Sequence, residues 1–173
     1  MVVCLVSGLS GSGKTTLVER LVPALARRGV PAATVKHHRG RIEVDREGKD
    51  TWRHRRAGAR ATFLVTEGEV AAFFDRPPDL DPGDLVRLCP PEVRILLVEG
   101  FKGLRGYPRI EVVRQGMERE SAWPDDVLCA ATDLAGLDAP FPVFSLDDAE
   151  GIAQYLVESL LGPSSLGRPT RPS

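Results

Sequence analysis

The chain has 173 residues, of which 42% are hydrophobic and 27% charged, and its formal net charge is −1. This composition is typical of one soluble, globular domain with a sizeable core, and the near-zero charge argues against a nucleic-acid or membrane-surface binder. No apolar run approaches the roughly 18 residues that a transmembrane helix needs, and no secretory signal is evident at the N-terminus. The three widely spaced cysteines are typical of reduced thiols, so we expect a cytoplasmic protein.

The strongest motif is a glycine-rich stretch between an apolar run and a helical pattern. Residues 2–6 indicate a strand, and leucines four residues apart from Leu17 onward line one face of a helix. The sequence between them matches G-x-x-x-x-G-K-[ST], whose backbone amides cradle phosphates at a helix N-terminus. The predicted phosphate-binding residues are Gly8, Ser10, Gly11, Ser12, Gly13, Lys14, Thr15 and Thr16. Lys14 would contact the outer phosphates, and the Thr15 hydroxyl would coordinate Mg²⁺.

The first helix is predicted to run from Lys14 to Arg28 and to end at Gly29, with a kink at Pro23. Residues 32–36 then indicate a second strand. Together these elements predict a β-α-β unit with a parallel, right-handed crossover.

Residues 36–60 contain all three histidines, nine Lys or Arg and four acids, with no sustained apolar face. Asp50 is predicted to N-cap a short helix that runs through Arg56 and ends at Gly58. The segment follows the second strand, at the carboxyl edge of the sheet where ligands bind. Its charges could form an ordinary solvated surface, but charge clustered at a cleft favours a site for a polyanion.

Two apolar runs, 61–66 and 69–74, are separated by Glu67-Gly68 and predict a β-hairpin that adds antiparallel strands to a mainly parallel sheet. A proline-rich loop and a short helix at about 84–88 follow. Arg94 to Gly100 predicts a buried strand, because its centre, residues 95–98, is fully apolar.

That buried strand ends in Glu99 and Gly100. In nucleotide-binding domains of this kind, the acid at such a strand end orders the Mg²⁺ shell and can orient a water. Glu99 is therefore predicted to lie beside the metal with Thr15 and to be the catalytic residue. The alternative is an acid at a solvated strand end.

Further strands are predicted at 109–114, 127–131 and 142–146, and a final amphipathic helix follows Asp147 and Glu150, which form a capping-box-like start. The predicted fold is a three-layer α/β sandwich over residues 1–162, with a flexible tail at 163–173. Asp133 could accept hydrogen bonds from guanine, but an ordinary loop aspartate is the alternative. Because the chain has no Asn, it cannot contain the usual guanine-reading motif N-K-x-D.

Lysine is rare in this chain, since 19 of the 23 basic residues are Arg. The four lysines are Lys14, Lys36, Lys49 and Lys102. A compact ammonium on a flexible stem cannot be replaced everywhere by the planar guanidinium. We therefore predict that these lysines contact one polyanionic ligand.

Taken together, these residues resemble the MobB family, the adaptor of molybdopterin guanine dinucleotide biosynthesis. The resemblance rests on residues 8–16, on Lys36-His37 with 44–45, 48–51 and 57–59, and on 98–102 with Pro108 and 109–114. These blocks span most of residues 1–114, and the second and third are specific to the family.

The resemblance implies a P-loop NTPase fold, GTP and Mg²⁺ binding, slow hydrolysis and a homodimer. It also implies a partner, the guanylyltransferase that joins molybdopterin to GMP. By position, the nucleotide-binding loop and Glu99 take the phosphate and metal roles. The residues that match the family's motif behind the second strand are His37, Asp45, Lys49 and Asp50.

Three hypotheses follow. The first is a GTP-binding adaptor whose segment 36–60 faces the pterin phosphate or the partner. The second is a small-molecule kinase in which that segment is the lid and Asp45 or Asp50 is the base. The third, a nucleic-acid-binding NTPase, is disfavoured because acids accompany the basic residues and no aromatic stacking platform is evident.

Overall fold

The computed structural model describes residues 1–38, 40, 42–101, 103–117 and 122–162. Lys102 and the predicted tail at 163–173 therefore lie outside the described residues. One compact unit comprises Met1–His37 and the chain from Pro82 onward, and the other comprises His38–Asp81. The sequence predicted one domain over 1–162 and did not indicate this division. Among the described residues, no helix is both long enough and apolar enough to cross a membrane.

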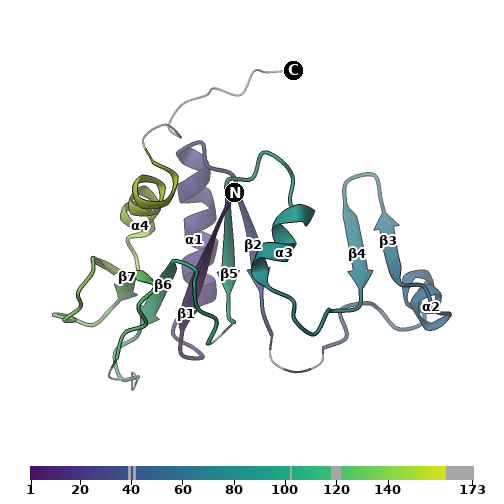
Figure 1. Ribbon diagram of the computed structural model, residues 1–173, viewed down its shortest axis with the longest axis horizontal. Helices are drawn as coiled ribbons and strands as arrows, with labels where there is room; N and C mark the ends of the chain where they lie inside the picture. The colour runs from purple at the N-terminus through teal and green to yellow at the C-terminus, as the bar shows by residue number, and fades with distance from the viewer. Residues whose placement is uncertain (39, 41, 102, 118–121, 163–173) are drawn as a thin grey trace. The chain divides into compact units, whose positions relative to one another are not determined.

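The larger unit is built on a six-stranded sheet in the order β2-β5-β1-β6-β7-β8, in which every pair of neighbours is parallel (Figure 1). Its strands are β1 Val2–Gly8, β2 Ala32–Lys36, β5 Ile95–Glu99, β6 Arg109–Val113, β7 Val127–Thr132 and β8 Val143–Ser145. The predicted α/β class and mainly parallel sheet are confirmed. Because β1 is parallel to both of its neighbours, β5 and β6, all three strands end at the same edge of the sheet.

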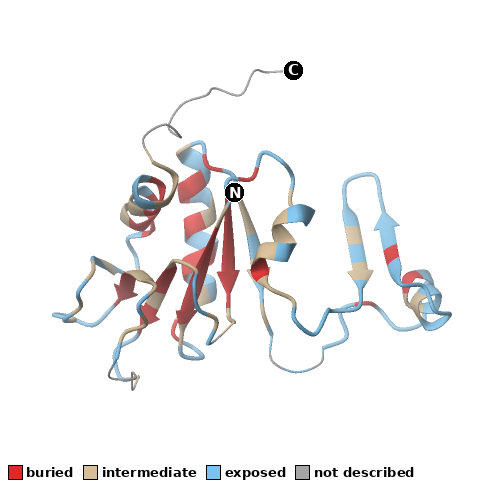
Figure 2. Ribbon diagram, in the orientation of Figure 1, coloured by how far each residue is buried: buried red, intermediate tan, exposed pale blue. Residues whose placement is uncertain are grey.

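Apolar side chains cover both faces of this sheet, and the buried residues follow the strands (Figure 2). The larger core cluster includes Cys4 and Val6 of β1, together with residues of α1 (Lys14–Arg27) and α4 (Ala149–Leu156). The smaller cluster includes Val3 and Leu5 on the opposite face. Burial on both faces explains why β1 and β5 are continuous apolar runs rather than alternating ones.

The smaller core cluster is covered partly by α3 (Pro82–Leu85) and the 3₁₀ turn Val86–Leu88, which contribute Leu85 and Val86. After α4, the chain continues as a π-helical turn, Val157–Leu161. Its first residue, Val157, extends the larger cluster.

The smaller unit contains α2 (Asp50–Arg56) and an antiparallel hairpin of β3 (Ala61–Val65) and β4 (Val70–Phe74). The hairpin was predicted correctly, but it forms a sheet of its own, so the expectation that it extends the parallel sheet is wrong. The two runs and the short turn between them predict that these strands pair with each other. This pattern carries no information about which other strand edge, if any, they join.

Two helix starts also differ from prediction. Lys49 is the N-cap of α2, and Asp50 is its first helical residue, 3.7 Å from Arg53 in an ion pair. At α4, Asp148 rather than Asp147 is the N-cap, accepting a 2.8 Å hydrogen bond from the backbone N–H of Gly151. The Lys49 side chain makes no capping hydrogen bond, so only α4 has a side-chain cap of the predicted kind, one residue later than expected.

Candidate functional site

The loop between β1 and α1 requires glycine where the chain passes closest to a neighbouring strand. Gly8 has φ +139°, and a Cβ placed on it would lie 2.4 Å from the carbonyl oxygen of Val112 in β6. Gly13 has φ +96° and caps the N-terminus of α1, whose first turn contains no acid. The backbone can therefore turn tightly into a helix whose N-terminus favours an anion.

Two polar groups of this loop fit a bound phosphate. Lys14 Nζ turns back over the loop, donating to the carbonyl oxygens of Gly8, at 3.1 Å, and Leu9. Burial lowers the pKa of Lys14 below its ordinary value, although Glu99 opposes this shift. Ser12 is 1% exposed, and its hydroxyl has no hydrogen-bond partner in the described part of the chain. A phosphate oxygen would satisfy such donors.

Thr15, Lys36 and Glu99 meet at the carboxyl edge of the sheet. Glu99 pairs in register with Val6 of β1 on one side and with Lys36 of β2 on the other. Thr15 Oγ1 donates to Oε1 and Oε2 of Glu99 at 2.8 and 2.9 Å. Lys36 Nζ forms an ion pair with Glu99 and lies 3.3 Å from Thr15 Oγ1. The structure thus brings together three of the predicted site residues.

A hydroxyl and a carboxylate are the hard oxygen ligands that Mg²⁺ prefers, so Thr15 and Glu99 fit the predicted metal. Among the described residues, no group of three His, Cys, Asp or Glu could hold a metal ion. Mg²⁺ in this place would complete its shell with water and phosphate oxygens, as it usually does.

His37 packs against the loop that follows β5. Its backbone N–H donates to the carbonyl oxygen of Glu99 at 2.8 Å, and its ring lies 4.3 Å from that of Phe101 between centroids. A Cβ on Gly100, which has φ +105°, would lie 2.9 Å from the His37 Cβ. His37 therefore fixes the loop that follows Glu99.

Asp133 is engaged within its own neighbourhood. Its carboxylate accepts a 2.6 Å hydrogen bond from the backbone N–H of Gln115 and lies 3.4 Å from Arg114 in an ion pair. The carboxylate therefore joins the loops after β6 and β7.

The family comparison agrees with this geometry. The family model described as "Molybdopterin guanine dinucleotide synthesis protein B" matches residues 2–133. The chain belongs to the MobB family.

Relatives of similar length support this assignment. The molybdopterin-guanine dinucleotide biosynthesis adapter protein of Escherichia coli K12 is 33% identical over 155 residues, which cover 86% of this chain and 87% of that relative. The adapter protein of Haemophilus influenzae is 35% identical over 152 residues, covering 87% and 85%. The crystal structure of Bacillus subtilis MobB matches with a TM-score of 0.69 at 26% identity, covering 96% of this chain and 99% of that one. A Bacillus stearothermophilus homolog of MobB matches with a TM-score of 0.62 at 28% identity, covering 91% and 97%.

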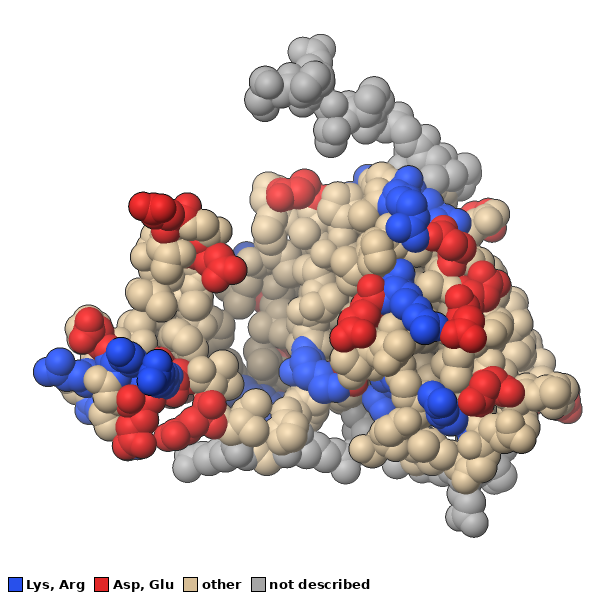
Figure 3. All heavy atoms as spheres, turned by 180° about the vertical axis from the view of Figure 1, so that it is seen from behind, with Lys and Arg blue, Asp and Glu red and all other residues tan. Residues whose placement is uncertain are grey.

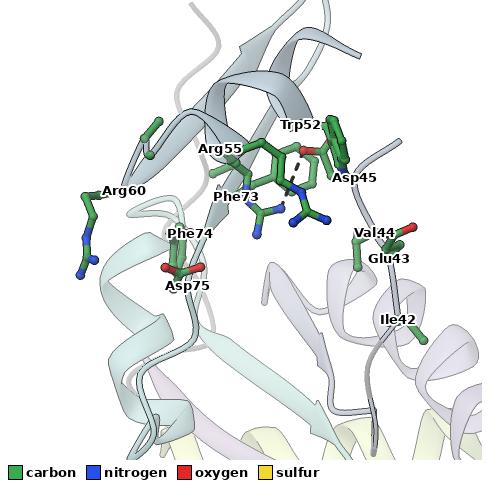
Figure 4. Close-up of a pocket in the computed structure, with 14 residues that line it drawn as sticks. Ile42, Glu43, Val44, Asp45, Trp52, Arg55, Arg60, Phe73, Phe74 and Asp75 are labelled. Carbon is green, nitrogen blue, oxygen red and sulfur yellow. Dashed lines mark ion pairs between the residues drawn. The ribbon is translucent and has the colours of Figure 1, made fainter. Parts of the chain in front are cut away.

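In this MobB chain, Asp45, Lys49 and Asp50 belong to the smaller unit. Asp45 is 8% exposed, accepts a 2.8 Å hydrogen bond from Thr51 Oγ1 and lies 3.8 Å from Arg55 in an ion pair (Figure 4). Lys49 and Asp50 are exposed. Thr51 thus occupies Oδ1 of Asp45, whereas the buried Oδ2 has the ion pair with Arg55 and no hydrogen-bond partner in the described part of the chain.

A cavity of about 780 Å³ opens within this smaller unit, with Asp45 and aromatic and arginine side chains in its wall (Figure 4). Arg55 lies 5.8 Å from the centroid of the Phe73 ring, and Arg56 lies 5.0 Å from that of Trp52. Aromatic rings therefore hold Arg55 and Arg56, and Arg55 is also paired with an acid.

Sequence reasoning missed a second polar cluster of the larger unit. Arg109 is 3% exposed and donates to Asp126 Oδ2 at 2.6 Å, and Ser7 donates to Glu111. The only signal was the alternation of β6, in which Arg109 and Glu111 lie between apolar residues.

The Arg109–Asp126 pair predicts a pH-dependent stability. Burial alone would raise the pKa of Asp126, but the hydrogen bond and charge of Arg109 outweigh it and hold that pKa below its ordinary value. The pair therefore stabilises the fold above the unfolded-state pKa of about 4, and this contribution is lost as the pH falls through the lower folded-state pKa.

We expect Asp126→Asn to lower the free energy of unfolding by about 3 kcal/mol at pH 7, because it leaves Arg109 buried without its counter-charge. The difference from the parent should narrow at pH 3. Urea unfolding at both pH values measures it, with the exposed neighbour variant Asp125→Asn as the control. An equal loss at both pH values would contradict this assignment.

Proposed function

We propose that this protein is an adapter of molybdopterin guanine dinucleotide biosynthesis that binds GTP and Mg²⁺ in the loop Gly8–Thr16. The observation that carries the proposal is the hydrogen-bonded pair Thr15–Glu99 at the N-terminus of α1, next to Lys14. Relatives named as adapter proteins of this pathway support the biological role. The preference for guanine rests on family membership.

In this proposal, different residues bind the phosphates and the metal. The loop amides, Lys14 and the Ser12 hydroxyl bind phosphate oxygens, and Thr15 and Glu99 hold the metal, which would neutralise phosphate charge. Glu99 also orients a water, while Lys36 exchanges its contact with Glu99 for one with the phosphates. Hydrolysis is slow in this proposal, because no arginine finger is assigned.

In this proposal the protein is cytoplasmic, forms a homodimer and works with the guanylyltransferase. The described buried residues of the smaller unit are the polar Asp45, Thr51 and Thr62, whereas Phe63 and Val65 of its hairpin are 64% and 70% exposed. A second copy would cover such an apolar surface. On the face drawn in Figure 3, basic side chains are interspersed with acidic ones, which supports a protein without a nucleic-acid partner.

Replacing Lys14 tests the phosphate site. Lys14→Ala should weaken GTP binding by about 2–4 kcal/mol, or roughly 30- to 1,000-fold, because a charged phosphate partner is lost. Equilibrium titration with a fluorescent GTP analogue measures the change. Arg94→Ala, at the amino end of β5 and so at the opposite edge of the sheet, is the matched control. Unchanged affinity of Lys14→Ala would refute the phosphate assignment.

Nucleotide identity is tested by thermal unfolding with GTP or ATP, each with Mg²⁺ or with a chelator. GTP at 100 times its dissociation constant should stabilise the fold by about 2.7 kcal/mol. The shift should shrink for ATP and without Mg²⁺, because the guanine and metal contacts are then missing. Equal shifts with both nucleotides would contradict guanine preference.

The adapter role predicts a change in another protein's reaction. Adding this protein to the guanylyltransferase, with molybdopterin and limiting GTP, should raise the rate of dinucleotide formation, since the bound nucleotide is delivered. Lys14→Ala should give little stimulation, and Arg94→Ala should behave like the parent. Equal stimulation by Lys14→Ala would separate the adapter role from GTP binding.

A further inference from the structure

A second cavity, of about 260 Å³, lies beside the phosphate-binding loop within the larger unit. Its wall includes Ser7, Lys14, Arg105, Arg109, Glu111 and Trp123. The residues at its base come from the last residues of β1 and from β6, which pair in register at Ser7 and Glu111. The cavity therefore lies at the same sheet edge as the proposed nucleotide site and shares Lys14 with it.

The polar side chains of this cavity stand where the strand pattern leads one to expect apolar ones. On this face of β1, Val3 and Leu5 belong to the smaller core cluster, and the next residue on the same face is Ser7. On β6, Ile110 and Val112 belong to the larger cluster, so Arg109 and Glu111 face the opposite side. Burying polar groups is costly unless they gain partners, so this cluster requires a reason.

Part of the cluster lacks partners. Nε of Arg109 and Oδ1 of Asp126 are buried without a hydrogen-bond partner in the described part of the chain, although the two side chains pair through their other atoms. Ser7 donates to Oε2 of Glu111, and Oε1 accepts no hydrogen bond from a described residue. Glu111 is therefore held in place by one oxygen and can accept new donors on the other.

Trp123 supplies a flat, fixed wall. Its ring meets Phe141 edge-on, with centroids 4.9 Å apart. A planar ligand could stack on an indole held in this way while donating to Glu111. The volume suits a single bicyclic ring better than a whole nucleotide, since sites for larger ligands usually exceed about 300 Å³.

We propose that this cavity binds a planar nitrogen heterocycle with adjacent ring N–H and amino donors, the edge that pterins and guanine share. Glu111 accepts from these donors, Ser7 positions Glu111, and Trp123 stacks on the ring. Arg105 and Lys14 face any phosphate that the ligand carries. The inference rests on the proposed function, because it places a second ligand beside the nucleotide phosphates.

Tryptophan fluorescence can report on this site alone. The chain has two tryptophans, and Trp52 belongs to the smaller unit, so Trp52→Phe leaves Trp123 as the single reporter. Titration of Trp52→Phe with 6-hydroxymethylpterin should quench this fluorescence in a saturable way. Adding Glu111→Gln should weaken binding at least tenfold, because the carboxylate and its charge are lost. Glu92→Gln, an exposed position, is the matched control and should change nothing.

The outcomes separate this inference from the proposed function. Guanosine should also quench, because it presents the same donor edge to Glu111, whereas adenosine that quenches as tightly as the pterin would overturn the assignment, because it lacks the ring N–H donor. Absence of quenching, while GTP still stabilises the protein thermally, would refute heterocycle binding in this cavity and leave the proposed nucleotide site untouched. If Glu111→Gln fails to fold, Ser7→Ala replaces it and should weaken pterin binding several-fold without altering GTP binding; unchanged pterin affinity would refute the role of Glu111.

Discussion

The hydrogen bonds from Thr15 to Glu99 join residues 84 positions apart, and the rest of the site depends on them. They exist because β1 and β5 are parallel neighbours, with Val6 opposite Glu99, and because α1 begins directly after the turn that follows β1. Parallel strands bring all their carboxyl ends to one edge. The N-terminus of α1, Lys36 and Glu99 therefore meet there although they are far apart in the sequence.

Lys36 shows how the same edge balances its charge. Glu99 is 6% exposed, and an isolated carboxylate at that depth would be costly. Its ion pair with Lys36 supplies a positive charge next to the Thr15 hydroxyl, the place that the metal would take. In the proposed site, Mg²⁺ would compete with Lys36 for the same carboxylate. Such an exchange would couple the proposed metal binding to a movement of Lys36 toward the phosphates.

The sequence predicted the parts of the site that depend on local chain geometry. Residues 8–16 and Glu99 could be predicted as candidate site residues because a glycine turn and a strand end have local patterns, and the strand at 32–36 has the predicted bounds. Ser7 and Glu111 were missed because their contact depends on the register of β1 against β6. Register between distant strands has no local signature, so the sequence could not indicate that these two residues meet.

Charge counted along a segment also differs from charge available to a ligand. Residues 36–60 carry nine basic residues against four acids, which favoured a polyanion site. In the structure, Arg55 pairs with Asp45 and packs on Phe73, Arg56 packs on Trp52, and Lys36 pairs with Glu99. The described buried side chains of the smaller unit are polar, so the contacts of Arg55 and Arg56 supply packing that an apolar core would otherwise provide. A basic side chain that stabilises the fold in this way can turn to an anion only by giving up its packing, which reduces the affinity that the count alone suggests.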